Sequence, residues 1–595
     1  MNWEYTDKIH NSYELRQKQK NVSNTVFPIT CFNNDKERAN NLAEDFIKRY
    51  QNEVKNLTSN ELKEAIEDYE KINEKIGKLY SYVSLSFSIN TDKPEYGQKY
   101  QEIRELASKI YSNLIFFELE IMNISDEKSS LLMSNEDISI WKPWLRRIFQ
   151  RKPFQLSSDL EQFIAEKSPS GRGAWVRLFD ESSSDLRFNI RGDIISETQI
   201  LNLLSDQDPE LRKEAGLEFS KVLDENKRTR SLILNTISRD KFIEDKKRGF
   251  KNPISSRNLD NDVEDEVVKA LAEAVTARFK DLSHRYYKLK SKWFGKERLN
   301  WWDRNAPLPN KPNQKWSWNE AREIVLSSFT ELSPEIAKIA RRFFDNNWID
   351  AEIRNGKDSG AYAHPCVPDV HPYILMNYSG KSRDVMTLAH ELGHGVHQTL
   401  ASENGYLLSD TPLTLAETAS VFGEMLVFQK LLSKADTEEN KKSMMAEKVE
   451  DMLNTVVRQI AFHNFETAFH DKRKSNELMP EQISEIWMET QSQALGDGIQ
   501  LDDSYRSLWS YIPHFVHTPF YVYAYAFGDC LVNSLWQVRL SDSSNFTENY
   551  LNLLKSGGKN HHKDALSPFG LDASDPKFWD IGLNTISSLI DDLEK

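Results

Sequence analysis

The stretch Ala389-His-Glu-Leu-Gly-His394 carries the sharpest chemical signal in the chain. In a helix, His390 and His394 lie four residues apart and therefore on one face, so two imidazoles can reach one metal ion. Glu391, the next residue round the helix, can then hold a water molecule and take its proton. The pattern predicts a zinc site with Glu391 as its general base. The alternative is a buried helix whose histidines bond to backbone or carboxylate groups.

A catalytic zinc site usually has three protein ligands and one open position, so another ligand must come from elsewhere in the chain. Residues 413–426 have a strongly helical pattern that places Glu417 and Glu424 on one face. Glu417 is the candidate third ligand, although Thr414-Leu-Ala-Glu417 also fits a capping box. Glu424 could accept the free N–H of a ligating histidine, or lie on a solvated face.

Two residues near the motif invite further hypotheses. His397 lies on roughly the same helix face as the ligands, and we expect an outer or core role because a fourth ligand would close the site to water.

Before the motif, Pro372-Tyr-Ile-Leu-Met-Asn-Tyr378 has the pattern of a short apolar strand. If this is an edge strand, Tyr373 lies where an extended peptide could bind through main-chain hydrogen bonds. A plain core strand fits the sequence equally well.

A second segment concentrates His and Tyr: Tyr511-Ile-Pro-His-Phe-Val-His-Thr-Pro-Phe-Tyr-Val-Tyr-Ala-Tyr525. Its imidazoles and neutral hydroxyls can donate hydrogen bonds to the oxyanion of a tetrahedral intermediate. We expect this segment to provide oxyanion donors (His514, Tyr521 and Tyr523) and substrate contacts (His517 and Tyr525). Because the tyrosines alternate, the sequence leaves open which of them faces the metal and which are core aromatics.

Together these motifs resemble the oligoendopeptidase F branch of the thimet-oligopeptidase-like zinc metallopeptidases. The resemblance rests on the histidine motif, on Leu-Ala-Glu417-Thr-Ala-Ser and on the apolar segment that ends at Tyr378. It implies a mainly helical ellipsoid divided by a deep substrate channel, with zinc on the channel wall and a small β element beside the zinc helix. It also implies that Glu417 is the third ligand, and it matches the His/Tyr segment to one that the family places across the zinc.

Composition narrows the class of protein further. The chain has 595 residues and a net charge of −14, which disfavours a nucleic-acid partner because phosphate binding needs clustered Lys and Arg. It contains no run of about 18 apolar residues, so we expect no membrane span. The first residues, Met1 to Lys8, lack the apolar stretch of a signal peptide. The cysteines (Cys31, Cys366 and Cys530) are far apart, and we expect three reduced thiols in a cytoplasmic protein.

The pattern along the rest of the chain predicts helices with few interruptions. Apolar stripes indicate two long packed helices, the first opened by a capping box at Thr58 and the second running from residue 96 to 121. Residues 141–168 indicate another pair of helices, and 263–293 a single long one. Residues 174–179 alternate as a strand would, and 188–195 indicate a small hairpin. We expect an N-terminal helical region with that hairpin at 1–195 and a catalytic region at 196–595, in one continuous globule.

The hypothesis from the sequence is a zinc metalloendopeptidase that holds one zinc ion per chain and cleaves internal bonds of short unstructured peptides. One alternative is a zinc carboxypeptidase or dipeptidase, which would need a cationic anchor such as Arg354, Lys381 or Arg383. The other is a helical peptide-binding protein without catalytic metal. The sequence does not specify the peptide-length limit, the residue preference or the oligomeric state.

Overall fold

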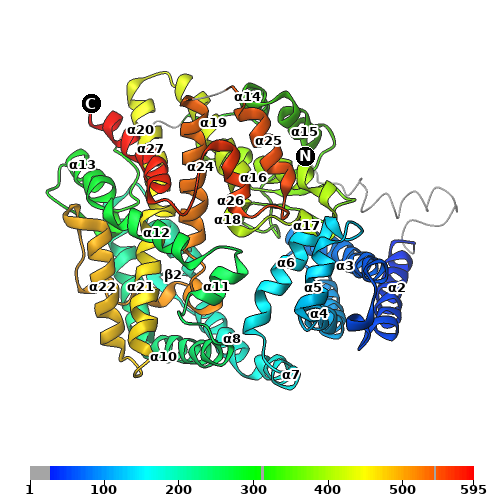
Figure 1. Ribbon diagram of the computed structural model, residues 1–595. Coiled ribbons are helices and arrows are strands. Elements are labelled where there is room, and N and C mark those ends of the chain that lie inside the picture. Colours follow the sequence, from blue (N-terminus) through cyan, green and yellow to red (C-terminus); the bar gives the residue numbers. More distant parts are fainter. Residues whose placement is uncertain (1–26, 310–313, 542–543) are drawn as a thin grey trace. The chain divides into compact units, whose positions relative to one another are not determined.

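The computed structural model describes residues 27–309, 314–541 and 544–595 (Figure 1). The signal-peptide argument falls on Met1 to Lys8, which lie outside the described residues. Long helices make up most of the chain and the strands are two or three residues long, so the predicted mainly α fold class is confirmed. Within the described ranges, no helix is long and apolar enough to cross a bilayer.

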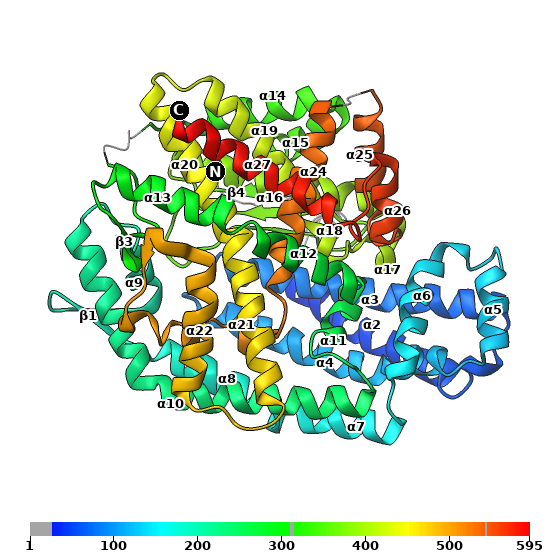
Figure 2. The ribbon, with the colours of Figure 1, turned by 60° about the vertical axis from the view of Figure 1, so that its left-hand side comes forward.

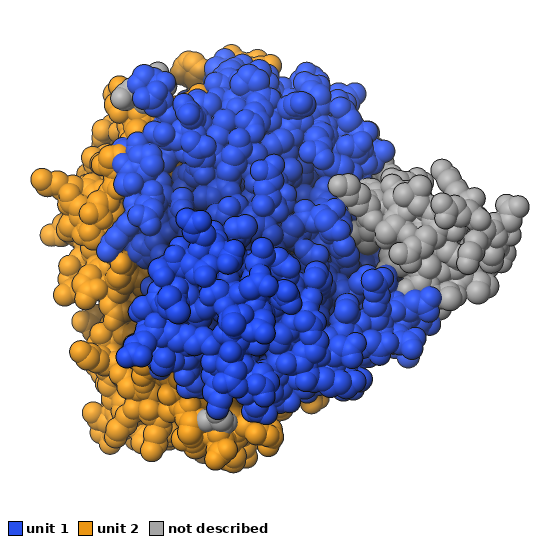
Figure 3. Space-filling model, turned by 45° about the vertical axis from the view of Figure 1, so that its right-hand side comes forward, with its two compact units in different colours: residues 1–152, 314–433, 542–569 blue, residues 153–313, 434–541, 570–595 orange. Residues whose placement is uncertain are grey.

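The chain divides into two compact units, each built from three separate segments (Figure 3). Unit 1 comprises Met1–Lys152, Gln314–Ser433 and Asp542–Phe569, and unit 2 comprises Pro153–Asn313, Lys434–Ser541 and Gly570–Lys595. The histidine motif belongs to unit 1, and the His/Tyr segment belongs to unit 2. The division of the chain into functional regions near residue 195 stays a prediction.

The N-terminal part of unit 1 is a group of helices around one apolar core. The helices are α2 (Phe27–Tyr50), α3 (Ser59–Ser88), α4 (Pro94–Met122), α5 (Asp126–Ser134) and α6 (Lys142–Arg151). The predicted capping box is present at Thr58, whose side chain accepts from the backbone N–H of Glu61. The predicted stripes of α3 and α4 face each other in the core, where Ile66, Ile110 and Phe117 are buried.

The remainder of unit 1 surrounds α16 (Ser382–Ala401), the helix that carries the histidine motif. Its other elements are α14 (Trp318–Leu332), α15 (Pro334–Asp345), β4 (Ile349–Asp350), β5 (Tyr362–His364), β6 (Tyr373–Leu375), α17 (Tyr406–Ser409), α18 (Leu413–Ala416), α19 (Thr418–Ser433), α25 (Phe546–Ser556) and α26 (His562–Leu566). Both β5 and β6 contact α16, so the small β element beside this helix is present as predicted.

The expectation that Tyr373 lies on an edge strand is wrong. The sheet order is β4-β6-β5, so β6 pairs with a neighbour on each side and has no free backbone edge. The side chain of Tyr373 is 0% exposed and packs in a cluster with Val367 and Val370. The apolar sequence reflects a central buried strand, and β5 is an outer strand instead.

Unit 2 is organised on α10 (Pro209–Arg248), which packs against α21 (Val457–Arg473) and α22 (Pro480–Leu495). Figure 2 shows α21 and α22 side by side above α10. Its other elements are α7 (Ser158–Lys167), α8 (Arg172–Ser184), β1 (Phe188–Ile190), β2 (Asp193–Ile195), α9 (Glu197–Leu203), α11 (Ser255–Asp260), α12 (Asp265–Ala277), α13 (Arg285–Trp293), β3 (Leu299–Asn300), α20 (Glu438–Thr455), β7 (Ile499–Gln500), α23 (His514–His517), α24 (Tyr523–Ser541) and α27 (Pro576–Glu594). The antiparallel pair β1–β2 is the predicted hairpin.

Two predictions in unit 2 are wrong. Residues 174–179 form part of the helix α8 and not a strand, because Trp175, Val176 and Phe179 pack together at helical spacing. Residues 263–293 are not one helix: α12 ends at Ala277, and a π-helical turn at Lys280–His284 precedes α13. A π-helical turn is an irregularity of the backbone hydrogen bonds, which the pattern of apolar residues over the whole stretch does not show.

The side chains of two cysteines are described. Cys530 is buried in α24 and Cys366 is partly buried, and neither forms a disulfide. The side chain of Cys31 lies outside the described part, so the expectation of three reduced thiols stays a prediction for this residue.

Candidate metal centre

The motif helix α16 packs closely against α19, and glycine makes this approach possible. A Cβ atom on Gly393 would lie 2.4 Å from the backbone oxygen of Ala419, well inside van der Waals contact. A Cβ atom on Gly423 of α19 would lie 3.0 Å from the backbone oxygen of Ala389. The glycine between the two motif histidines therefore lets the backbones approach, which brings Glu417 and Glu424 to the histidine face.

We expect Gly393→Ala to lower the free energy of unfolding by about 1–3 kcal/mol, because the added methyl forces the two backbones apart. It should also weaken metal binding, since α16 and α19 each contribute to the site. Urea unfolding and metal titration measure both effects. The matched control is Gly97→Ala in α4, where the nearest side-chain atom to a new Cβ is 3.5 Å away. Equal effects of the two variants would contradict this account.

Three side chains of unit 1 converge in one cluster: His390, His394 and Glu417. The Nε2 atoms of His390 and His394 lie 3.1 Å apart. The Oε2 atom of Glu417 lies 3.5 Å from the first of these nitrogens and 3.3 Å from the second. The structure thus brings together the three residues that the sequence analysis named as ligands.

Glu424 contacts the opposite side of the His390 ring. Its Oε1 atom lies 2.6 Å from Nδ1 of His390. A carboxylate only accepts hydrogen bonds, so this contact places the proton on Nδ1 and leaves the Nε2 lone pair of a neutral His390 directed at the cluster. The hydrogen bond suggested for Glu424 from the sequence is therefore present.

Glu417 lies at a break between two helices. It follows the last residue of α18 and precedes the first of α19, and this break directs its side chain toward α16. The capping-box alternative for Thr414 is wrong, because α18 begins at Leu413 with Pro412 before it and has no side-chain cap. Instead, the hydroxyl of Ser420 donates to Oε2 of Glu417 at 2.6 Å. The sequence analysis missed Ser420, although its position three residues after Glu417 could have indicated it.

The cluster carries more negative than positive groups. Burial lowers the pKa of His390, but the hydrogen bond and charge of Glu424, with Glu417 and Glu391 nearby, outweigh burial and raise it to about 9. Burial raises the pKa of Glu417, but hydrogen bonds and charges from His394, His390 and Ser420 outweigh it and lower the value to about 2. These carboxylates therefore create a local environment that favours a cation.

The geometry of the cluster suits zinc. A tetrahedral zinc ion with nitrogen and oxygen ligands at about 2.0–2.2 Å holds its ligand atoms roughly 3.4 Å apart. The separations of 3.1, 3.3 and 3.5 Å among the three ligand atoms are close to this value. The donor set and the spacing thus fit a divalent metal.

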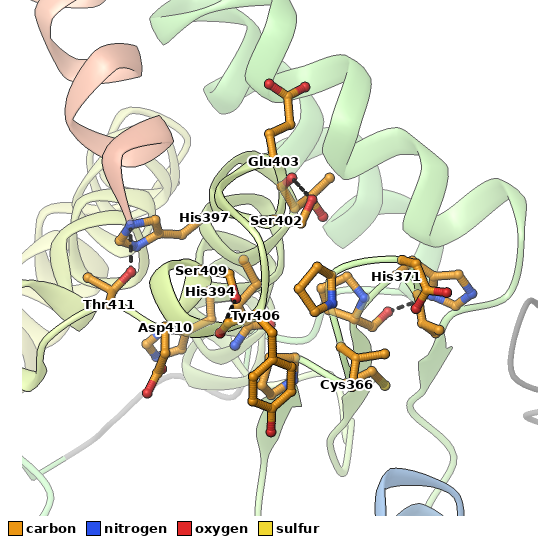
Figure 4. Close-up of a pocket in the computed structure, with 18 of the residues that line it drawn as sticks. Cys366, His371, His394, His397, Ser402, Glu403, Tyr406, Ser409, Asp410 and Thr411 are labelled. Carbon is orange, nitrogen blue, oxygen red and sulfur yellow. Dashed lines mark hydrogen bonds between the residues drawn. The ribbon is translucent and has the colours of Figure 1, made fainter. Parts of the chain in front are cut away.

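A cavity of about 1070 Å³ opens beside the cluster, lined entirely by unit 1 (Figure 4). His394 and His397 of α16 contribute to its wall, together with residues of the 365–372 and 402–411 segments. His397 is buried, and its Nε2 atom lies 3.3 Å from the hydroxyl of Thr411. This contact, drawn in Figure 4, supports the core or outer role over a fourth ligand.

In unit 2, the predicted His/Tyr segment forms a cluster of its own. The imidazole of His514 stacks on the ring of Tyr521, with centroids 5.6 Å apart. Its Nε2 atom lies 3.2 Å from the hydroxyl of Tyr525. All three side chains are half-buried. His514, Tyr521 and Tyr525 are hereafter called the His/Tyr cluster.

Two members of the predicted set point elsewhere. Tyr523 is 0% exposed, and its hydroxyl accepts a hydrogen bond from Asn261 at 2.8 Å, so its assignment as an oxyanion donor is not supported. The ring of His517 binds Asp180 of α8 at 2.6 Å, which anchors α23 and leaves this nitrogen engaged, so its assignment to substrate is not supported. The rings of Tyr521, which precedes α24, and Tyr525, in its first turn, contact each other with centroids 5.4 Å apart.

The structure also bears on the cationic anchor of an exopeptidase. The guanidinium of Arg354 forms two hydrogen bonds to the carboxylate of Asp350, the shorter 2.5 Å long. Lys357 also donates to Asp350 in the same group. Arg354 is therefore already paired and is a poor candidate for binding a substrate carboxylate.

The class of protein follows from comparison with known families. Residues 202–585 match the model of Peptidase family M3, and the chain belongs to this family. Residues 120–188 match the model named Oligopeptidase F, which confirms the resemblance to the oligoendopeptidase F branch.

Relatives and solved structures agree with this assignment. The chain is 26% identical to Oligopeptidase PepF of Bacillus subtilis, over 90% of this chain and 81% of that protein. It is 27% identical to an oligoendopeptidase F homolog of Borreliella burgdorferi, over 90% of this chain and 91% of that protein. Among solved structures, a putative peptidase from Chlamydophila abortus has a TM-score of 0.82 at 23% identity, over 92% of each chain. Oligoendopeptidase-F from Enterococcus faecium has a TM-score of 0.73 at 20% identity, over 95% of this chain and 98% of that chain. Both solved structures thus have the same fold as this chain.

Proposed function

We propose that this M3 peptidase is a zinc-dependent endopeptidase that cleaves internal bonds of short unstructured peptides. The observation that carries the proposal is the convergence of His390, His394 and Glu417 with ligand atoms 3.1 to 3.5 Å apart. Two histidines and one glutamate are a known ligand set of catalytic zinc. We infer one zinc ion per chain and a cytoplasmic location.

These three side chains would hold the metal, and Glu424 would fix the orientation of the His390 ring. Zinc bound there would act as a Lewis acid that polarises the scissile carbonyl and makes a water molecule more acidic. Glu417 keeps its negative charge because its pKa is low, and Ser420 fixes the oxygen that faces the histidines.

Glu391 is the proposed general base. It is 5% exposed and lies near enough to both histidines to feel their charges. Burial raises its pKa, opposed by His390 and His394, and a raised value suits a carboxyl that first accepts and then returns a proton. The water oxygen attacks the carbonyl carbon while Glu391 takes one water proton. As the C–N bond breaks, Glu391 passes this proton to the leaving nitrogen.

The His/Tyr cluster is the proposed source of oxyanion donors. The hydroxyls of Tyr521 and Tyr525 and the imidazole of His514 can each donate a hydrogen bond to the developing negative charge. The family resemblance supports this role, and the mutual contacts of the three side chains support a preorganised group. Tyr525 takes the place that the sequence analysis gave to Tyr523.

Short peptides are the proposed substrates. The cavity of about 1070 Å³ beside His394 is at the upper end of the range for ligand pockets, so it has room for several peptide residues. Hydrolysis of an internally quenched peptide blocked at both ends tests the proposal, because an exopeptidase cannot cleave it. Cleavage at an internal bond is the expected result, and cleavage of only the unblocked peptide would contradict endopeptidase activity.

Replacing Glu424 tests the proposed orientation of His390. Glu424→Ala removes the acceptor 2.6 Å from Nδ1, and we expect zinc affinity to fall about 10- to 100-fold. Glu424→Gln keeps a carbonyl oxygen as acceptor, so its zinc affinity should fall less. Competition with a chelator of known affinity measures the change. If Glu424→Ala bound zinc as tightly as the wild type, the orientation of the His390 ring would not depend on its contact with Glu424.

A further inference from the structure

The turn that joins α23 to α24 contains an unusual backbone conformation. Phe520 has a φ of +62°, in the left-handed region that a bulky residue rarely adopts. The residue after it is Tyr521, whose ring stacks on His514. A change in the backbone conformation of Phe520 would therefore move the adjacent Tyr521. The residues that hold this turn can thus affect the geometry of the His/Tyr cluster.

A carboxyl from α21 holds the turn. The backbone N–H of Phe520 donates to Oε1 of Glu466 at 2.7 Å. Glu466 is 2% exposed, and among the described residues its second oxygen, Oε2, has no hydrogen-bond partner. The aromatic ring of Phe520 packs against His470, with centroids 4.8 Å apart. The bond to Phe520 is therefore the hydrogen bond that retains this buried carboxyl in an apolar environment.

Neighbouring contacts hold the same turn from α11. The guanidinium Nε of Arg257 donates to the backbone oxygen of Pro519 at 3.3 Å. Asn261 donates to the hydroxyl of Tyr523 at 2.8 Å. The chain is thus held before Phe520 at the Pro519 carbonyl and after it at the Tyr523 side chain, while Glu466 alone among these groups binds Phe520 itself.

We propose that Glu466 is a positioning residue: its buried carboxyl holds Phe520 in the left-handed conformation and so sets the orientation of the His/Tyr cluster. The inference rests on the proposed function in one respect, the role of that cluster as oxyanion donors. Without the carboxyl, the Phe520 N–H would be buried without a partner and the turn would relax to an ordinary conformation. Tyr521, Tyr525 and His514 would then lose their common alignment.

The chemistry of Glu466 provides a conservative variant. Burial raises the pKa of Glu466 to about 8, with smaller opposing effects from the Phe520 N–H, Arg257 and Lys241, so the carboxyl is largely neutral at pH 7. Glutamine is close in shape to a neutral glutamic acid, and its carbonyl oxygen can accept from Phe520. Leucine fills similar space but offers no acceptor. Aspartate keeps the carboxyl and withdraws it by one methylene.

The test compares kcat and KM on the end-blocked peptide for the full-length wild type, Glu466→Gln, Glu466→Leu and Glu466→Asp, with zinc content and thermal unfolding of each. We expect Glu466→Leu and Glu466→Asp to lower kcat about 100-fold, because a misplacement near 1 Å has effects of this size. KM and zinc content should stay close to wild type, and Glu466→Gln should restore kcat. Folded Leu or Asp variants with wild-type kcat would overturn the proposal.

A double-mutant cycle separates positioning from general damage. Replacing all three donors, by Tyr521→Phe, Tyr525→Phe and His514→Ala together, should lower kcat, and adding Glu466→Asp should lower it only slightly further, because both changes disable the same group. Effects that multiply would show that Glu466 acts elsewhere and would overturn the proposal. If Tyr525→Phe and His514→Ala both kept wild-type kcat, the oxyanion role of the cluster would have failed instead. The two failures are therefore distinguishable.

Discussion

Glu391→Gln should reduce kcat on an end-blocked peptide by about 100- to 10,000-fold, because glutamine cannot accept the proton of the attacking water. The variant should keep its metal. Glu391 on α16 is close enough to the cluster to feel its charges, but the group whose atoms converge at ligand distances consists of His390, His394 and Glu417. Turnover and zinc content, measured on one preparation, test both statements together.

A matched substitution controls for the loss of one carboxylate. Glu323 is exposed on α14 in the same unit, and Glu323→Gln should leave kcat, KM and zinc content unchanged. If Glu391→Gln lost zinc along with activity, Glu391 would be a ligand and the assignment of roles would be wrong. If it kept wild-type turnover, the general base would be another group.

The second large effect is expected for Glu417→Ala, which removes one of the three converging ligand atoms. In the wild type, zinc at about 1,000 times its dissociation constant should add about 4 kcal/mol to the free energy of unfolding. At the same zinc concentration we expect Glu417→Ala to lose most of this stabilisation and to be inactive. Chemical unfolding with and without zinc gives the difference directly.

The zinc-free proteins provide the reference for this experiment. Without zinc, Glu417→Ala should be less stable than the wild type, since it loses the contacts of the carboxylate with the histidines and Ser420, so the quantity to compare is the gain in stability that zinc adds to each protein. Glu323→Ala should respond to zinc as the wild type does. Equal stabilisation of wild type and Glu417→Ala by zinc would place the metal elsewhere.

Much of the metal cluster could be predicted from the sequence because its geometry is local. The spacing of His390 and His394 follows from the period of one helix, and Glu417 immediately precedes α19, the long helix that contains Glu424. The close packing of α16 against α19, which brings the histidines and glutamates together, cannot be predicted from the spacing of apolar residues. Gly393 shows this, because the close approach of α16 to Ala419 depends on a missing side chain.

The less accurate expectations share a different cause. Tyr523 and Tyr525 differ by two positions, and only the start of α24 decides which of them faces His514. The sequence leaves open whether Tyr373 lies on an edge or a central strand, because an apolar run does not show how many neighbours its strand has. In α8, six alternating residues were too few to distinguish a strand from a helix. Each of these points concerns the direction of a side chain or the packing of a short segment, and both depend on residues far away in the sequence.

Some partners had no signal in the sequence at all. Asp180 binds His517, and Glu466 binds the backbone of Phe520, across separations of 337 and 54 residues. An acidic residue on an amphipathic helix is ordinarily solvated, and nothing in the local pattern distinguishes Glu466 from such a residue. Its burial is known only from the packing of α21 against the turn.

The most direct test of the metal centre is anomalous diffraction at the zinc edge from crystals of the zinc-loaded protein. The account predicts one strong peak per chain, within about 2.2 Å of Nε2 of His390, Nε2 of His394 and an oxygen of Glu417. A peak coordinated by other residues, or no peak at this cluster in zinc-loaded and active protein, would contradict it.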